Sequence, residues 1–139
     1  MKPKICIVAA NYYQDIAKDL VKGSTSLLKT HNLKFKILYA PGIFEIPFLL
    51  TNNIGKYNAF IALGCVIKGE TPHFDFISRA AINGIIDLSI KYKKPITNGI
   101  ITCLNKDQAK ERSDPNKRNK GEEAARAVFS VLGILKNES

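Results

Sequence analysis

Short apolar runs alternate with stretches of helical periodicity along the whole chain. The apolar runs cover residues 4–10, 34–39, 59–67 and 96–104. The helical stretches between and after them cover residues 16–32, 47–54, 72–92, 106–112 and 121–136. This alternation predicts an α/β fold, in which a parallel sheet carries helices on both faces and the crossovers are right-handed. The run 4–10 has no polar alternation and is expected to be a central strand, and the run 59–67 is expected to be a buried strand. The run 34–39 partly alternates and is expected nearer the sheet edge.

We expect residues 1–139 to form one domain, because a chain of 139 residues suits one core and contains no repeat, linker or low-complexity segment. The composition, with 45% hydrophobic and 24% charged residues, is that of an ordinary globular protein. No apolar run approaches the ~20 residues that span a bilayer. The first apolar run is expected to be a strand rather than a signal peptide. The sequence therefore predicts a cytoplasmic protein with no membrane partner.

The chain is basic, with 21 Lys and Arg residues against 12 Asp and Glu residues and a net charge of +9. Such a charge suits either nucleic acid or a small anionic substrate. Much of the excess lies in residues 106–120, and Lys91, Lys93 and Lys94 form a second cluster. Neither cluster contains the interleaved aromatic residues of a single-strand binding platform. A solvated basic surface is the preferred interpretation, and no nucleic-acid partner is expected.

The three cysteines, Cys6, Cys65 and Cys103, are widely spaced, and each lies inside an apolar run. This placement is typical of reduced thiols that pack as small hydrophobic side chains. No CxxC pair or Cys/His spacing of a zinc site is present. No metal site is expected.

Three polar turns follow the ends of predicted strands, at residues 11–15, 41–47 and 68–75. The carboxyl ends of parallel strands meet at one edge of a sheet, which is the usual ligand site of open α/β folds. We therefore expect these turns to build one pocket. The fourth strand delivers Asn105 and the basic segment after it to the same edge.

The turn at 68–75 has the features of an anion site. Thr71 is expected to be the N-cap of a helix with Pro72 at its first position. Free N–H groups from Gly69 to Thr71 could then bind an anion such as phosphate. His73 would stand beside this anion and suits proton transfer, although a packed or surface histidine without a role fits its position equally well.

Other residues of the turns allow two interpretations each. Tyr12 and Phe44 lie outside the periodic core positions, so they either line a site for a planar ligand or anchor their loops. Glu45 either caps the following helix or binds ligand hydroxyls. Arg112 is a bidentate phosphate partner in principle, but one arginine in a basic segment decides nothing.

Taken together, the motifs in these turns resemble those of the 6,7-dimethyl-8-ribityllumazine synthase family of riboflavin biosynthesis. Residues 41–47 read PGIFEIP, where the family has PGxFE[IL]P, and residues 63–75 read LGCVIKGETPHFD, where it has LGxVI[RK]GxTxH[FY]D. Near the C-terminus, QAKER at 108–112 and NKG at 119–121 match a QAxER…NKG pattern. The likeness covers nearly the whole chain, in the right order and spacing.

This resemblance implies a flavodoxin-like three-layer α/β/α sandwich around a central four-stranded parallel sheet. It also implies a homopentamer, or an assembly of pentamers, with active sites shared between neighbouring subunits. The reaction it implies joins 5-amino-6-(D-ribitylamino)uracil to L-3,4-dihydroxy-2-butanone 4-phosphate and gives 6,7-dimethyl-8-ribityllumazine, phosphate and water. The resemblance implies no cofactor for this reaction.

The resemblance also assigns roles to residues around the ring of the pyrimidine substrate. Tyr12 is expected to stack on the ring, and Val66 and Ile67 to line its edge. The backbone and carboxylate of the segment Ile43, Phe44 and Glu45 are expected to hold the ribityl chain.

A second set of roles concerns the phosphate and proton transfer. Gly69, Glu70 and Thr71 would bind phosphate at the helix start, with Arg112 as the charged partner. His73 would shuttle protons. Arg112 and Lys120, together with Asn98, are expected from the adjacent subunit.

Two positions depart from the commonest family pattern. Asn98 stands where many members have phenylalanine near the ring, and Asn11 replaces a frequent arginine. Both changes bear on ligand affinity, but neither removes a proton-transfer or phosphate group. A flavin- or lumazine-binding paralogue with weak catalysis is the alternative, and His73 together with Arg112 favours the enzyme, because binding of a ring and ribityl chain requires neither.

Overall fold

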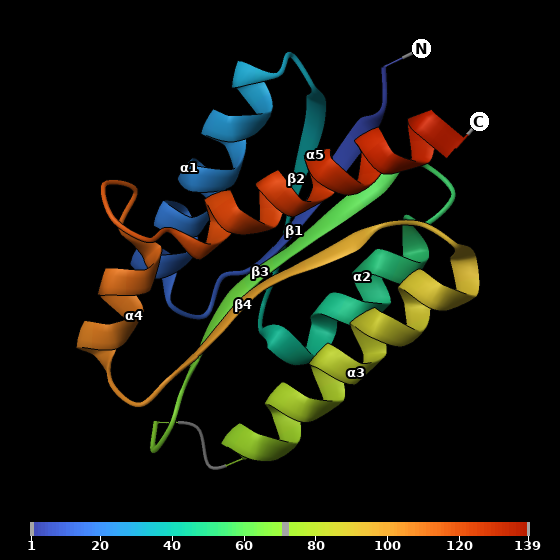
Figure 1. The fold of residues 1–139 in the computed structure, drawn as a ribbon. Coiled ribbons are helices and arrows are strands. Elements are labelled where there is room, and N and C mark those ends of the chain that lie inside the picture. Colours follow the sequence, from blue (N-terminus) through green and yellow to red (C-terminus); the bar gives the residue numbers. More distant parts are fainter. Residues whose placement is uncertain (1, 71–72, 139) are drawn as a thin grey trace.

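A computed structural model describes residues 2–70 and 73–138 of the chain (Figure 1). Its centre is a four-stranded parallel sheet with the strand order β2-β1-β3-β4. The strands are β1 (Lys4–Ala10), β2 (Lys34–Ala40), β3 (Ala59–Ile67) and β4 (Ile96–Cys103). The order places β1 inside the sheet and β2 at one edge, as the sequence predicts.

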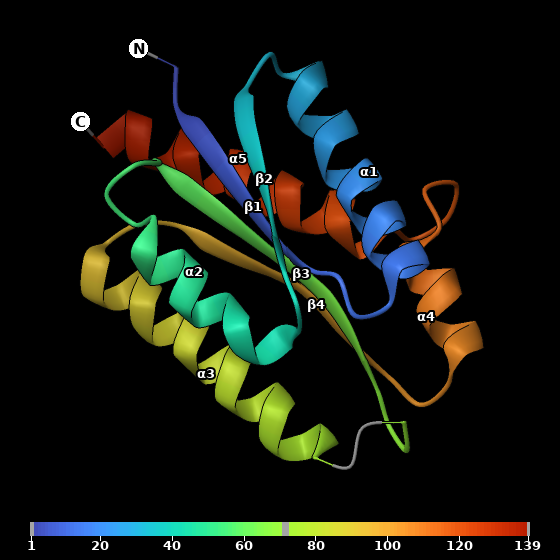
Figure 2. The same ribbon diagram turned by 180° about the vertical axis from the view of Figure 1, so that it is seen from behind.

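Helices cover both faces of this sheet, as Figures 1 and 2 show from opposite sides. One face carries α1 (Gln14–Thr30), α4 (Lys106–Ser113) and α5 (Lys120–Glu138). The other face carries α2 (Ile46–Asn52), preceded by the short 3-10 helix η1 (Ile43–Glu45), and α3 (Phe74–Tyr92). The arrangement is the expected flavodoxin-like three-layer α/β/α sandwich.

Alternation along the buried strands builds two separate cores. In β1, Ile5, Ile7 and Ala9 point to the core beneath α1 and α5, while Cys6 and Val8 point to the core beneath α2 and α3. All nine residues of β3 are buried. A strand without polar alternation is required here because each of its faces is covered by helices.

The strand bounds agree with the sequence prediction to within one residue, but α1 and α3 each start two residues away from the predicted position. Helix α1 begins at Gln14 rather than at Ile16. Helix α3 begins at Phe74 with His73 as its N-cap residue, rather than at Pro72 with a Thr71 cap. Thr71 and Pro72 themselves lie outside the described residues. The predicted turn at 41–47 contains η1 and the first two residues of α2. Helix ends are set by cap geometry, which apolar periodicity does not report.

The contact between α1 and α5 explains the NKG segment. Asn119 is buried, and its side-chain oxygen accepts a hydrogen bond from the Glu122 N–H (2.8 Å), so that it caps α5. Its amide nitrogen donates to the carbonyl oxygens of Asp19 (2.9 Å) and Ser113 (2.6 Å). A Cβ at Gly121 would collide with the Leu20 carbonyl oxygen of α1. The asparagine and the glycine therefore fix where α5 starts, and with it the position of Lys120.

The three cysteines are free and buried, as predicted. None of the helices in the described part of the chain is both long and apolar enough to cross a membrane.

Candidate active site

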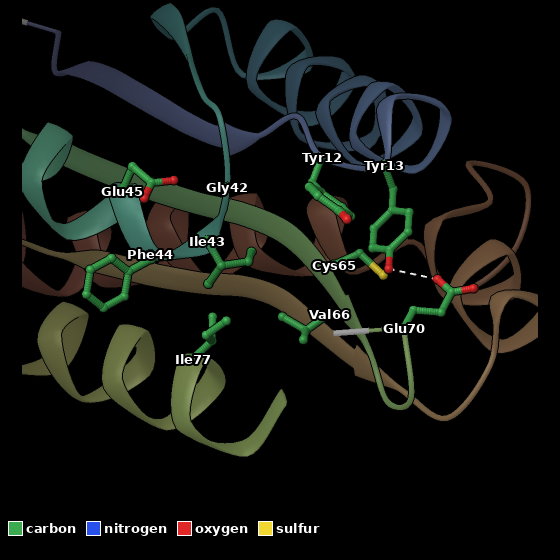
Figure 3. A pocket seen from close by; sticks show the side chains of 10 residues that line it. All are labelled: Tyr12, Tyr13, Gly42, Ile43, Phe44, Glu45, Cys65, Val66, Glu70 and Ile77. Atoms are coloured by element: carbon green, nitrogen blue, oxygen red, sulfur yellow. Dashed lines mark hydrogen bonds between the residues drawn. The ribbon is translucent and has the colours of Figure 1, made fainter. Parts of the chain in front are cut away.

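A cavity of about 280 Å³ opens at the carboxyl edge of the sheet (Figure 3). All three predicted turns contribute to it, together with the end of β3 and the first turns of α3. It is lined by Tyr12, Tyr13, Gly42, Ile43, Phe44, Glu45, Cys65, Val66, Glu70 and Ile77. The expectation that the turns build one pocket is therefore confirmed for this part of the site.

Aromatic side chains form two walls of the cavity. Tyr12, in the turn after β1, and Phe44, in η1, are each 67% exposed. The Tyr12 ring meets the Tyr13 ring edge-on, with centroids 5.0 Å apart and planes at 81°. Exposed aromatic rings held by a rigid scaffold offer a face on which a planar ligand can stack.

The η1 segment is placed against the sheet by a glycine. Ile43 is 6% exposed, and its side chain occupies the space beside Gly64 of β3, where a Cβ would collide with the isoleucine. The next two residues, Phe44 and Glu45, are exposed and line the cavity. The buried Ile43 side chain thus places the Phe44 ring and the Glu45 carboxylate at the cavity.

The end of β3 supplies an apolar floor. Val66 lines the cavity, whereas the side chain of Ile67 is 1% exposed and packs in the core beneath α1 and α5. Ile67 is therefore covered and is not among the residues that line the cavity. Cys65 also lines the cavity, but burial and the neighbouring Cys103 thiol raise its pKa strongly. A thiol that stays protonated is a packing group rather than a nucleophile.

The turn after β3 differs from the predicted row of free donors. Gly69 has a φ of +87°, and the Glu70 N–H donates to the Ile67 carbonyl oxygen at 3.3 Å. This N–H is used by the turn, so the prediction of free N–H groups is wrong for Glu70. The Glu70 carboxylate instead accepts a hydrogen bond from the Tyr13 hydroxyl at 2.8 Å, drawn in Figure 3. Thr71, the third predicted phosphate-binding residue, lies outside the described residues.

His73 stands at the start of α3 and is exposed. Its carbonyl oxygen accepts the first helical hydrogen bond from the Ile77 N–H at 2.9 Å. His73 does not line the cavity, but Ile77, four residues later, does. Residues four apart share one face of a helix, so the histidine stands one turn before the cavity wall.

A second cavity, of about 660 Å³, lies along the exposed edge of β4 and shares no lining residue with the first. It is polar and basic, and its lining includes Asn98, Thr102, Arg112, Arg118 and Lys120. The Arg112 guanidinium donates to the Thr102 carbonyl oxygen at 3.0 Å and to Cys103 Sγ at 3.7 Å. These bonds hold the guanidinium at the carboxyl end of β4.

Asn98 and Lys120 also have partners within the chain. The Asn98 side-chain oxygen accepts a hydrogen bond from the Ile100 N–H at 2.9 Å. Lys120 Nζ lies 3.4 Å from a Glu123 carboxylate oxygen, and both side chains are substantially exposed. A surface pair of this kind is weak and leaves the ammonium available to an anion.

The structure thus places nine of the predicted residues in two cavities, whereas Ile67, Gly69 and His73 line neither. The first cavity brings together Tyr12, Ile43, Phe44, Glu45, Val66 and Glu70, and the second brings together Asn98, Arg112 and Lys120. Tyr13 and Ile77 line the first cavity but were not among the predicted residues. The aromatic character of Tyr13 was visible beside Tyr12, whereas no sequence signal singles out Ile77 among the apolar positions of its helix. Among the described residues, no group of three His, Cys, Asp or Glu side chains is arranged to hold a metal ion.

Comparison with known proteins gives one consistent family. The family model of 6,7-dimethyl-8-ribityllumazine synthase matches residues 2–136. The 6,7-dimethyl-8-ribityllumazine synthase of Vesicomyosocius okutanii is 40% identical, over 96% of this chain and 86% of its own. 6,7-Dimethyl-8-ribityllumazine synthase 1 of Rhodopseudomonas palustris is 41% identical, over 94% and 85% of the two chains. The enzyme of Campylobacter curvus is 36% identical, over 98% and 90%. The chain belongs to the 6,7-dimethyl-8-ribityllumazine synthase family.

Proposed function

We propose that this protein condenses 5-amino-6-(D-ribitylamino)uracil with L-3,4-dihydroxy-2-butanone 4-phosphate to give 6,7-dimethyl-8-ribityllumazine, phosphate and water. The observation that carries the proposal is the aromatic cavity at the carboxyl edge of the sheet, which is lined by Glu70 of the polar turn after β3 and by Ile77, one helical turn beyond His73. A planar, hydroxylated substrate suits this lining. Family membership supplies the name of the reaction.

The first cavity is proposed to hold the pyrimidine substrate. Tyr12 stacks on the ring, and Val66 borders its edge. The backbone at Ile43 and Phe44 and the Glu45 carboxylate bind the ribityl hydroxyls. These roles are supported by the exposure of the Tyr12 and Phe44 rings and by the position of Glu45 in the lining.

The turn after β3 is proposed to take the phosphate of the second substrate. Gly69, Glu70 and Thr71 approach it through the backbone, and the Glu70 N–H must exchange its weak turn bond to do so. His73 moves protons as the amine attacks the ketone, the imine forms with loss of one water, phosphate leaves and the ring closes with loss of a second water. Since the substrates carry the reactive groups, we propose no cofactor, and alignment alone can supply roughly 7–11 kcal/mol of the barrier.

We propose further that the active site is completed by a neighbouring subunit, in a homopentamer or an assembly of pentamers. Arg112, Lys120 and Asn98 line a different cavity from Tyr12 and Glu70, so one chain does not bring Arg112, the proposed charged partner of the phosphate, to the cavity of the ring. The first cavity, at about 280 Å³, lies just below the ~300–1,000 Å³ of typical ligand pockets. A second subunit would supply the missing wall.

The outer face of α3 supports this assembly. Phe76, Ile86 and Ile90 are 78%, 52% and 69% exposed, and Phe48 of α2 is 70% exposed. Large apolar side chains gathered on one layer are typical of surfaces buried between subunits.

We also propose that residues 1–139 form one domain that works in the cytoplasm on small molecules, with no nucleic-acid or membrane partner.

An absorbance assay of lumazine formation tests the reaction. Both substrates are mixed with the wild type, with Arg112→Ala and with His73→Ala, and each rate is compared with the spontaneous condensation. Loss of charge-assisted hydrogen bonds to phosphate is expected to reduce kcat/KM by about 10- to 100-fold in Arg112→Ala. His73→Ala is expected to lose less, because the uncatalysed chemistry already proceeds and the substrates stay oriented.

Arg126→Ala is the matched control, since Arg126 is exposed on α5, pairs with Glu122 and lines neither cavity. It should retain the wild-type rate. A wild type no faster than the spontaneous reaction would refute the proposed activity, and binding of the ring product by such an inactive protein would indicate the paralogue. An Arg112→Ala variant as fast as the wild type would refute the phosphate site alone.

Mixing variants tests the shared site. Tyr12→Ala impairs one half-site and Arg112→Ala the other, so assemblies containing both chains should regain sites in which both residues are intact. We expect activity above the sum of the separate variants after unfolding and refolding the two chains together. Activity that merely adds would contradict a site formed by two subunits.

A further inference from the structure

Tyr13 lies at a junction between the two walls of the first cavity. It directly precedes α1 as the N-cap residue, and its carbonyl oxygen accepts the first helical hydrogen bond, from the Ala17 N–H at 2.9 Å. Ala17 and the adjacent Ile16 are each 1% exposed. The backbone of Tyr13 is therefore fixed to a helix whose start is locked into the core.

The Tyr13 side chain uses both its ring and its hydroxyl. The ring packs partly against the core and meets the Tyr12 ring edge-on at 5.0 Å. The hydroxyl donates to a Glu70 carboxylate oxygen at 2.8 Å, across 57 residues of sequence. In Figure 3 the two side chains reach toward each other at the end of β3. One residue thus contacts the stacking ring and the turn that leads to His73.

The turn that Glu70 belongs to is otherwise exposed. Lys68, Gly69 and Glu70 are all exposed, and the Glu70 N–H bond to Ile67 is long at 3.3 Å. The Lys68 N–H anchors the start of the turn to the Cys103 carbonyl oxygen at 2.8 Å. The Tyr13 hydroxyl adds an anchor at its end. Hydrogen bonds at Lys68 and at Glu70 together reduce the conformational freedom of this turn.

Lys106 also lies near the Tyr13 ring. Its Nζ lies 6.0 Å from the centroid of the Tyr13 ring, and it is the first residue of α4, the helix that carries Arg112. Tyr13 consequently contacts residues from the turn after β1, the turn after β3 and the start of α4.

We propose that Tyr13 is a positioning residue for the reaction. Its hydroxyl holds Glu70, and with it the phosphate-binding turn, at a fixed place relative to Tyr12, while its ring supports the edge of the Tyr12 ring. This inference rests on the proposed function, because it assigns Tyr13 to the placement of the two substrates.

Two substitutions separate the two roles of Tyr13. Tyr13→Phe removes the hydroxyl and keeps the ring, so the KM for the butanone phosphate is expected to rise by about five- to tenfold, while the KM for the pyrimidine stays unchanged. Tyr13→Ala also removes the ring that supports Tyr12, so both KM values should rise. Loss of structural stability alone would reduce the amount of active enzyme without this separation.

A double-mutant cycle tests whether the hydroxyl acts through Glu70. Glu70→Ala should raise the KM for the butanone phosphate about as much as Tyr13→Phe, and the double variant should be no worse than either, because both changes remove one interaction. Tyr92→Phe is the matched control, since Tyr92 lies at the last residue of α3 and lines neither cavity.

The outcomes separate this inference from the proposed function. An active wild type with an unchanged KM for the phosphate substrate in Tyr13→Phe would refute the positioning role and leave the function standing. Additive effects of Tyr13→Phe and Glu70→Ala would refute it as well. A wild type without acceleration would refute both the function and the inference.

Discussion

Gly23 of α1 and Asn119 are in contact where α5 begins. Substituting alanine at each position, alone and together, gives a strict test of this contact. The three atoms nearest to a Cβ built on Gly23 all belong to the Asn119 amide group, and they lie too close for both groups to fit. Both residues are buried. Gly23→Ala in the wild type should therefore overpack the contact and destabilise the protein by about 1–3 kcal/mol.

Asn119→Ala has a cost of its own. It deletes the cap of α5 and two donors to buried or partly buried carbonyl oxygens, those of Asp19 and Ser113. A lost cap costs about 1 kcal/mol, and each carbonyl left without its donor about 1 kcal/mol or more. We expect a loss of about 3–4 kcal/mol in the free energy of unfolding.

The two changes should compensate each other. Once the amide is gone, alanine at position 23 no longer collides, and in a helix interior it is favoured over glycine by about 1 kcal/mol. Gly23→Ala should thus destabilise the wild type but slightly stabilise Asn119→Ala. The coupling energy between the two sites is then about 2–4 kcal/mol.

Urea unfolding of the four proteins at one fixed protein concentration measures this coupling. The concentration must be constant because the stability of an oligomer depends on it. Gly133→Ala is the control, since Gly133 lies in α5 and a Cβ there meets nothing within 4 Å. It should have the same small effect in both backgrounds. Equal effects of Gly23→Ala with and without the Asn119 amide would refute the proposed contact.

Two further predictions concern the turn and the core. Gly69→Ala forces an L-residue into a φ of +87° at a cost of about 1–2 kcal/mol, so the turn should shift and kcat/KM should fall. Gly55→Ala is the control, since a Cβ at Gly55 meets nothing within 4 Å, and it should leave kcat/KM unchanged. Equal kcat/KM values for Gly69→Ala and the wild type would contradict the need for this backbone conformation. Burial raises the pKa of the Cys6 thiol from 9.0 to about 11, so the unfolded chain ionises first and stability should fall as the pH rises from 9 to 11. Over this pH range the wild type should lose up to roughly 2–3 kcal/mol more of its free energy of unfolding than Cys6→Ala does. Parallel pH profiles of stability for the two proteins would contradict this prediction.

The sheet could be read from the sequence because each strand carries its own signal. The runs 4–10 and 59–67 are apolar on both faces, and these are the bounds of β1 and β3. Covered strands must be apolar throughout, and that requirement is local in the sequence. The start of α3 was misplaced because it depends on the cap geometry at His73, to which periodicity is blind.

The candidate site was only partly readable. The three turns were found because polar segments after apolar runs mark the carboxyl edge of a parallel sheet. The sequence did not show which residues of a turn or strand end line the cavity. Ile67 packs into the core, whereas its neighbour Val66 lines the cavity. Tyr13 was overlooked because its partner Glu70 is 57 residues away and no local pattern pairs them.

The sequence by itself determined the order of strands and helices, the polar turns and the residue types available for chemistry, because these follow from local patterns of apolar and polar side chains. Only the tertiary structure decided which residues share a cavity, that Asn119 and Gly121 fix the start of α5, and that Arg112 stands apart from Tyr12. The physical reason is that such contacts join segments far apart in the chain. Their geometry depends on the packing of helices against the sheet, which local patterns do not contain.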